Sequence, residues 1–328
     1  MTGSRRTVIT RACTCVVAAA MLAACAGSMP MPRPTAPVPD RQSALFAVPA
    51  EPLQPRIDRA KHRGTYSVQR LTFESVLHAP GLPPVEAFLY LPKEGRRFPL
   101  VLILPITRGD FFSTEFAVYF AERGLACVRF RSQGDVGRLY GDPASLPMFR
   151  DLLRARVIDT RRVLEWALRR SEIDDDRVAL VGFSHGAIVG GLVTAVEPRI
   201  KAAALVLGGG DLAGIIRDSS ERSLARIREG LMADHDLTTG GFYDAASAAL
   251  EDVDPLTYAP LISPRTILMI NARFDHVIRR PYTEALWRAL GRPELAWLPS
   301  GHYTAGFFTS YARHKIFDHM MRVFQSRP

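Results

Sequence analysis

The chain has 328 residues with 47% hydrophobic and 23% charged side chains, which is the composition of an ordinary globular protein. Its formal net charge of +9 comes from 38 Arg and 4 Lys, which are scattered rather than gathered into a basic patch with interleaved aromatic residues. The charge therefore gives no support to a nucleic-acid partner, and we expect none.

Residues 1–24 have the features of an export signal. Three positive residues, Arg5, Arg6 and Arg11, precede a run of 13 mostly small, apolar residues from Ala12 to Ala24. A helix needs about 20 residues to cross a bilayer, so this run is too short for a membrane span. Its length matches the hydrophobic region of a signal peptide, which is what we predict for residues 1–24.

The run ends in Leu22-Ala23-Ala24-Cys25, which resembles the lipobox of bacterial lipoproteins. The resemblance implies that Cys25 is acylated after cleavage and anchors the protein in the bacterial cell envelope, facing the periplasm or at the outer membrane. A plain cleaved signal peptide is the alternative. Ser4-Arg5-Arg6 leaves the export route open between the general secretory and the twin-arginine pathways.

Residues 25–63 are predicted to form a tether. Eight prolines lie between Pro30 and Pro55 with few large apolar side chains, and such a segment buries too little surface to offset its ordering entropy. Beyond it the sequence has one cysteine, Cys127, inside the apolar run Leu125–Val128. We therefore expect no disulfide framework and place Cys127 in the core.

Residues 64–328 predict one α/β domain. Two β-rich runs suggest an antiparallel opening, and strands then alternate with helices, which predicts a mostly parallel sheet with helices on both faces. The predicted strands are 66–77, 85–91, 100–104, 125–130, 178–181, 202–207, 266–270 and 294–298, and the main predicted helices are 113–123, 151–170 and 307–324.

Residues 211–253 interrupt this alternation. They are polar and helix-prone and contain no apolar strand. An insertion at the carboxyl ends of the strands would overhang the ligand crevice of such a sheet, so we predict a helical cap or lid. A surface helix pair without a role in binding is the alternative.

The strand 178–181 runs directly into Gly182-Phe183-Ser184-His185-Gly186. A nucleophile on a sharp strand-to-helix turn exposes its hydroxyl above the sheet, and the two glycines allow the close approach that such a turn needs. The N-terminus of the following helix adds partial positive charge where an oxyanion develops. The motif predicts Ser184 as a nucleophile.

This motif in this position resembles the α/β-hydrolase superfamily, and most of all its dienelactone hydrolase and acetyl xylan esterase-like branch, over about residues 85–325. The resemblance implies an α/β-hydrolase fold and a triad in the chain order serine, acid, histidine. Asp275 follows the strand 266–270 and matches the acid-bearing loop, and His302 follows the strand 294–298 and matches the histidine loop. We predict that Ser184, Asp275 and His302 form the catalytic triad.

Alternatives remain for each of these residues. A fortuitous helix-capping serine is the alternative for Ser184. Asp211 is the other candidate for the acid, and His314 or His319 for the base. The latter two lie in a helical run that should pack on the sheet.

The oxyanion hole needs two backbone donors. We predict the N–H groups of His185 and Ile106, with Thr107 as the alternative to Ile106. The loop Pro105–Gly109 lacks the His-Gly-Gly run of lipases, which argues against a bulky-acyl lipase. Four aromatic residues follow this loop and either line an acyl pocket or pack on the sheet: Phe111, Phe112, Phe116 and Tyr119.

The predicted function is hydrolysis of a carboxylic ester, on a small molecule or linked to a glycan, by a lipid-anchored envelope enzyme. Residues Gly208–Ala213 fit the dinucleotide-binding pattern, but no strand ending in an acid follows, and no His, Cys and Asp cluster has metal-ligand spacing. We therefore expect neither a cofactor nor a metal. The alternatives are a serine peptidase or other amide hydrolase and a non-catalytic envelope binding protein.

Overall fold

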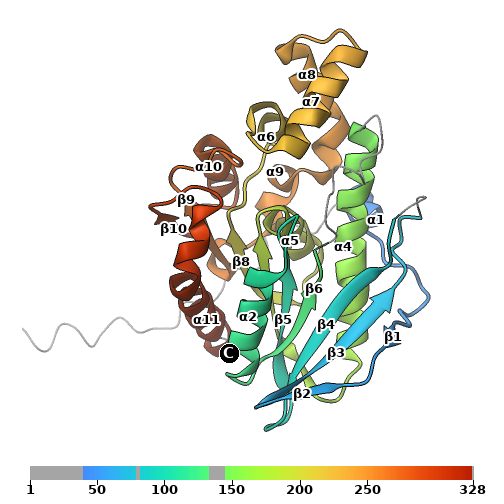
Figure 1. Cartoon of the computed structure of the whole chain (residues 1–328), viewed down its shortest axis with the longest axis vertical. Coiled ribbons are helices and arrows are strands. Elements are labelled where there is room, and N and C mark those ends of the chain that lie inside the picture. Colours follow the sequence, from blue (N-terminus) through green and yellow to red (C-terminus); the bar gives the residue numbers. More distant parts are fainter. Residues whose placement is uncertain (1–39, 79–81, 133–144, 327–328) are drawn as a thin grey trace, which may run out of the picture. The chain divides into compact units, whose positions relative to one another are not determined.

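The computed structural model describes residues 40–78, 82–132 and 145–326 (Figure 1). The predicted signal peptide, the predicted lipid-attachment residue Cys25 and the first part of the predicted tether lie outside the described residues. Within them, no helix is both long and apolar enough to cross a membrane.

In the described part of the chain, one mixed sheet of ten strands forms the centre of the domain. Its order is β1-β3-β4-β6-β5-β7-β8-β9-β10, and β2 pairs with β3. The strands are β1 (Arg56–Ile57), β2 (Lys61–Arg63), β3 (Tyr66–Phe73), β4 (Val85–Pro92), β5 (Phe98–Leu104), β6 (Ala126–Phe130), β7 (Ile173–Phe183), β8 (Ile200–Val206), β9 (Ile267–Ala272) and β10 (Glu294–Leu298).

The sheet has an antiparallel edge and a parallel body, as the sequence predicts. β1, β2, β3, β4 and β6 pair antiparallel to one another, whereas β6, β5, β7, β8, β9 and β10 are parallel. Every residue of β5, β6 and β9 is buried, because helices cover both faces of the parallel part. Cys127 lies in β6 with no exposed surface, which confirms it as a core residue.

Helices pack on both faces of this sheet (Figure 1). α2 and α11 contact each other on one face, and α4 and α5 contact each other on the other. The α-helices are α1 (Asp40–Leu45), α2 (Phe111–Ala121), α4 (Leu146–Leu168), α5 (His185–Val196), α6 (Leu212–Asp218), α7 (Arg222–Asp234), α8 (Thr239–Leu250), α9 (Pro255–Tyr258), α10 (Arg280–Ala289) and α11 (Thr309–Gln325).

The folded part of the chain begins earlier than the sequence predicted. The predicted tether extended to residue 63, but Phe46 is fully buried and packs its ring against Tyr258. The carbonyl of Phe46 also accepts a hydrogen bond from Arg161 at 2.6 Å. Residues of the same segment form α1, β1 and β2, and both strands pair with β3, so the burial of Phe46 is one of several contacts that dock the segment.

Residues 211–253 are helical throughout most of their length. Asp211 caps α6 by accepting a hydrogen bond from the backbone of Gly214, and Thr238 caps α8 by accepting one from Gly241. α6, α7 and α8 stand at the top of the view, above the sheet, and α8 also contacts α4 (Figure 1). We call α6, α7 and α8 the cap helices.

Candidate active site

Ser184 lies on the turn between β7 and α5. Its backbone has φ 52°, a left-handed value that costs a residue other than glycine about 1–3 kcal/mol. The turn is possible because the neighbouring chain segments are in near contact. A Cβ on Gly182 would lie 2.1 Å from the carbonyl oxygen of Gly186, and one on Gly186 would lie 2.4 Å from that of Leu104. The two glycines of the motif are therefore required by packing.

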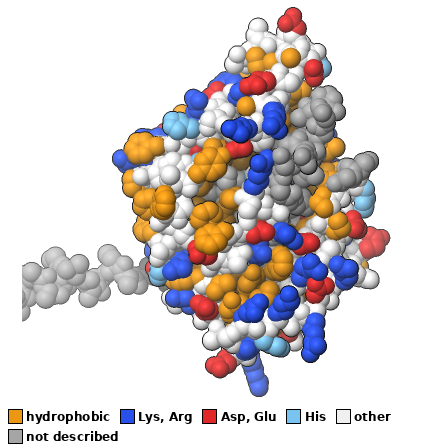
Figure 2. All heavy atoms as spheres, viewed as in Figure 1, with side chains coloured by type: hydrophobic (Ala, Val, Ile, Leu, Met, Phe, Trp, Pro, Cys, Tyr) orange, Lys and Arg blue, Asp and Glu red, His pale blue; other side chains and the backbone are white. Residues whose placement is uncertain are grey.

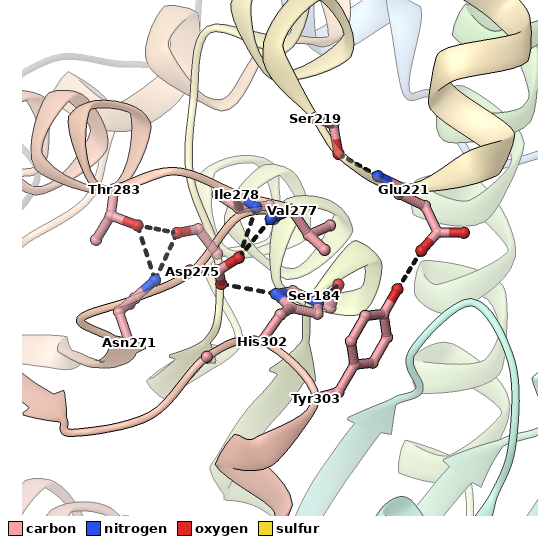
Figure 3. Close-up of polar contacts among 12 residues, drawn as sticks. Ser184, Ser219, Glu221, Asn271, Asp275, Val277, Ile278, Thr283, His302 and Tyr303 are labelled. Atoms are coloured by element: carbon pink, nitrogen blue, oxygen red, sulfur yellow. Dashed lines mark hydrogen bonds and ion pairs between the residues drawn. The ribbon is translucent and has the colours of Figure 1, made fainter.

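The three predicted triad residues meet in one hydrogen-bonded chain (Figure 3). The Ser184 hydroxyl lies 2.9 Å from Nε2 of His302, and Nδ1 of His302 lies 2.7 Å from Oδ2 of Asp275. All three side chains are largely shielded from water. The serine, the histidine and the carboxylate thus have the arrangement that a serine nucleophile needs.

The carboxylate of Asp275 is fixed by its own loop. Its second oxygen, Oδ1, accepts hydrogen bonds from the backbone of Val277 at 2.7 Å and of Ile278 at 2.9 Å (Figure 3). The loop is tied in turn to the histidine loop, because the backbone of Phe274 donates to the carbonyl of Ser300. Strand β9 and the segment after β10 therefore set the distance between acid and base.

The alternative acid and bases lie elsewhere. Asp211 is occupied as the cap of α6 and also accepts from the hydroxyl of Tyr243. Nδ1 of His314 is hydrogen-bonded to the carbonyl of Ser310 on its own helix, and Nε2 of His319 is hydrogen-bonded to the carbonyl of Thr266. None of these three side chains joins the bonded chain of Ser184.

Both predicted oxyanion donors adjoin Ser184. Ile106, Thr107 and His185 line the same pocket as the nucleophile. The first turn of α5 lies against the loop that carries Ile106, as the near contact of Gly186 with Leu104 shows. Loss of hydration, together with the positive charge of Arg156, lowers the pKa of the His185 side chain to about 4. That imidazole is therefore neutral at pH 7 and adds no charge beside Ser184.

A pocket of about 380 Å³ opens beside Ser184 and His302. Its walls come from the oxyanion loop, α2, α5, the cap helices α6 and α7, and the loops of Asp275 and His302. Phe112 and Phe116 both line it, and Phe116 packs against Phe183 with ring centroids 4.8 Å apart. Of the four aromatic residues that follow the oxyanion loop, Phe112 and Phe116 thus face the pocket, whereas neither the exposed Phe111 nor the buried Tyr119 lines it. An acyl-binding role for this pocket stays a prediction.

One contact at the rim of the pocket was not anticipated from the sequence. The hydroxyl of Tyr303, next to His302, donates to the carboxylate of Glu221, which precedes α7 (Figure 3). Loss of hydration and the bond to Glu221 raise the pKa of Tyr303 to about 12. The backbone of Ser220 also donates to the carbonyl of His276 at 3.0 Å. These contacts join the cap to the loops that carry Asp275 and His302, and no sequence pattern predicts them.

Two other sequence features have structural explanations. Gly208, Gly209 and Gly210 lie so close to Ala187, Ile278 and Leu256 that a Cβ on any of them would come within 3 Å of a side chain. The glycine run therefore serves packing.

An acidic group lies at the start of β7, away from Ser184, and consists, among the described residues, of Asp174, Asp175 and Asp176. Arg97 pairs with Asp175, and Arg177 pairs with Asp174.

Exposed aromatic side chains accompany the loops of the site. Phe274 precedes Asp275, Tyr303 follows His302, and both are more than half exposed. Phe307, in the connection to α11, and Tyr311, in the first turn of α11, are also exposed. Figure 2 shows that hydrophobic side chains on the face drawn there are interspersed with Lys and Arg.

The mixed sheet, the strained serine turn and the Ser184–His302–Asp275 chain of bonds define an α/β-hydrolase-fold protein of the serine hydrolase class. Comparison of the sequence with protein families narrows the class to one family. The chain belongs to the X-Pro dipeptidyl-peptidase family (S15), whose family model matches residues 84–258. This match includes Ser184, whereas Asp275 and His302 lie beyond it.

Comparison with curated proteins finds esterases. The chain is 31% identical over 159 residues to the esterase FrsA of Citrobacter koseri, a match that covers 47% of this chain and 36% of that protein. The same values hold for esterase FrsA of Salmonella newport. The match thus spans about a third of the length of these curated relatives.

Solved structures share the fold. The acetyl xylan esterase of Paenibacillus sp. R4 superposes with a TM-score of 0.66 at 18% identity, over 85% of this chain and 92% of that one. Identity this low shows the fold alone. The predicted α/β-hydrolase fold is therefore confirmed, and membership of the dienelactone hydrolase and acetyl xylan esterase-like branch stays a prediction.

Proposed function

We propose that this chain hydrolyses carboxylic esters through an acyl-enzyme on Ser184. The observation that carries the proposal is the unbroken chain of hydrogen bonds from the Ser184 hydroxyl through His302 to Asp275, at the wall of a pocket. The esterases among the relatives support the same class of substrate.

In the first step, Nε2 of His302 accepts the hydroxyl proton as the Ser184 oxygen attacks the ester carbonyl carbon. The carbonyl π electrons move to its oxygen. Asp275 holds the imidazole in the orientation in which Nε2 faces the serine, and it stabilises the imidazolium that forms. Its two bonds from the backbone N–H groups of Val277 and Ile278 keep the carboxylate in place.

The tetrahedral oxyanion is assigned to the backbone N–H groups of His185 and Ile106. The first belongs to the N-terminal turn of α5, where the helix dipole favours negative charge. Loss of one such donor typically costs about 3 kcal/mol of transition-state stabilisation.

The intermediate then collapses and breaks the bond to the alcohol oxygen, which takes the proton from His302. Water next attacks the acyl-enzyme while His302 accepts its proton, and the carboxylic acid leaves as Ser184 regains its hydrogen. The steps therefore balance with the ester, one water molecule and the side chains of Ser184, His302 and Asp275.

Hydrolysis of a peptide amide is the second candidate, because the family to which the chain belongs is named for a dipeptidyl-peptidase. Glu221, a carboxylate at the pocket rim, is the feature that favours it, since it could pair with a substrate amino group. The same triad supports either reaction.

We also propose that the protein is exported and lipid-anchored in the bacterial cell envelope. The support is the charged and apolar run of residues 1–24 followed by Cys25. Cells fed radiolabelled palmitate should label the protein, and Cys25→Ala should abolish the label. Labelling that survives this change would contradict the anchor.

The test of the enzymatic proposal uses the soluble protein that lacks residues 1–25. Hydrolysis of p-nitrophenyl butyrate and of Gly-Pro-p-nitroanilide is measured for this protein and for Ser184→Ala. We expect ester turnover that is lost by roughly 10⁴-fold or more in the variant. Turnover of the anilide with none of the ester would instead support the peptidase.

A further inference from the structure

The pocket beside Ser184 is far larger than a small acyl group requires. Its volume is about 380 Å³. A closed apolar cavity of about 150 Å³ is enough to take up benzene, so this pocket has room for a group with more than six carbon atoms. An acetyl group would leave most of it to water or to vacuum.

The pocket has a buried end and an exposed mouth. Phe116, Leu212 and Ile216 line it and are each about 1% exposed, whereas Arg108 and Tyr303 line it and are exposed to solvent. The buried end lies between α2, α5 and α6. Any group bound there is enclosed by side chains of the fold and by those of the cap.

The chemistry of the walls changes between the two ends. Among the described lining residues, the charged side chains are Arg108 and Glu221, and Glu221 is joined to Tyr303 at the rim. Beyond Ser184 and His302 the walls are mainly aliphatic and aromatic. A hydroxylated group such as a sugar would find few hydrogen-bond partners there, and burying polar groups without partners is costly.

We propose that this pocket selects a medium-chain acyl group of about six to ten carbons, a specificity that rests on the ester hydrolysis proposed above. The acyl chain takes the buried end because it remains bonded to Ser184 after the first step, while the alcohol must leave. The open, polar mouth serves that departure. The missing His-Gly-Gly run in the oxyanion loop argued against bulky acyl groups, but the pocket walls decide how much space the acyl chain has.

The first experiment varies only the acyl chain. The kcat/KM of the soluble protein is measured with p-nitrophenyl acetate, butyrate, hexanoate, octanoate and decanoate. Each methylene moved from water into the pocket is worth about fourfold, so we expect octanoate to exceed acetate by at least tenfold. A maximum at acetate would overturn the proposal and leave ester hydrolysis intact.

A matched pair of variants tests whether the pocket causes this preference. Leu224 and Leu231 are both half-buried on α7, two turns apart, and Leu224 lines the pocket whereas Leu231 is absent from its walls. Leu224→Trp should lower the octanoate-to-acetate ratio of kcat/KM at least tenfold by filling the space. Leu231→Trp should keep the ratio within about twofold. Equal ratios in the two variants would contradict the assignment.

A binding measurement separates this proposal from the proposed function. Decanoate is titrated calorimetrically into Ser184→Ala and into Ser184→Ala combined with Leu224→Trp. We expect the first protein to bind and the second to bind at least tenfold more weakly. If Ser184→Ala binds decanoate but the parent protein hydrolyses no ester, the proposed ester hydrolysis is contradicted and the acyl-binding pocket is supported. If the parent protein hydrolyses esters but decanoate does not bind, the acyl-binding pocket is contradicted and ester hydrolysis is supported.

Discussion

The triad and the cap are held in place by different kinds of contact. Ser184 is tied to the sheet through its backbone, which donates to the carbonyl of Val206 at 2.8 Å, and Asp275 is fixed by two backbone N–H groups. The cap instead meets the triad loops through one backbone bond, from Ser220 to His276, and through surface side chains such as Tyr303 and Glu221. Backbone bonds inside a sheet fix geometry tightly, whereas side-chain bonds at a surface leave more freedom.

The contact between α6 and α10 is also made by side-chain bonds. Asp218 bonds Arg217 and accepts from the hydroxyl of Tyr282. The bond from Arg217 comes first among the causes that lower the pKa of Asp218 to about 2, and loss of hydration raises that of Tyr282 to about 12. Arg217 and Asp218 are partly exposed, so their ion pair contributes little stability, whereas Tyr282 is buried. The chemistry thus rests on the rigid part of the molecule and the substrate pocket is partly walled by the more adjustable part.

The largest expected effect is that of a substitution in the triad. If this substitution has little effect, the contrast between a rigid triad and an adjustable cap is wrong. Asp275→Asn should lower kcat for an ester by about 10⁴-fold, because the amide no longer stabilises the required histidine tautomer and imidazolium. Asp211→Asn is the matched control, since Asn also tolerates the left-handed backbone and can cap α6. Steady-state kinetics of both variants checks this. A comparable loss in Asp211→Asn would contradict the assignment of the acid.

Two glycine substitutions compare the packing of the same two regions. Gly186→Ala should destabilise the protein by about 3 kcal/mol or more, because its Cβ would lie 2.4 Å from the backbone oxygen of Leu104. Gly230→Ala in α7 meets no atom within 4 Å and should stabilise by about 0.5–1 kcal/mol. Urea unfolding measures both. Equal effects of the two changes would show that the regions are packed alike.

Protonation of His185 should weaken the region around the nucleophile as pH falls. The pKa of His185 is lowered to about 4 in the folded protein, so between about pH 6.5 and pH 4 the unfolded chain binds a proton that the folded protein does not. Stability should therefore decrease by about 3 kcal/mol across this range. Denaturant unfolding at several pH values checks it. The same slope in His185→Gln would assign the effect to other groups.

The smallest effect concerns the contact between cap and histidine loop. Tyr303→Phe removes the hydroxyl bonded to Glu221 and should change the free energy of unfolding by less than about 1 kcal/mol. Hydrogen exchange of α7 amides should nevertheless increase, with α5 unchanged. Tyr311→Phe, at another exposed tyrosine near the site, is the control. Faster exchange in α5 as well would mean that cap and triad open together.

The sequence alone determined the parts of the site that depend on local structure. An apolar strand followed by Gly-x-Ser-x-Gly predicted a sharp turn at Ser184, and Asp275 and His302 were found because the resemblance to the α/β-hydrolase superfamily implies an acid and then a histidine after later strands. The carboxyl ends of parallel strands meet at one edge. The order of strands and turns therefore predicted that the three side chains would converge.

Only the tertiary structure decided the features made by residues distant in the chain. Asp275 rather than Asp211 faces His302, Phe46 docks on Tyr258, and Tyr303 meets Glu221, which lies 82 residues away in sequence. The pocket combines walls from α2, α5, the cap and two loops. No local pattern encodes such contacts, because they depend on how separate helices pack, and packing is set by the whole core at once.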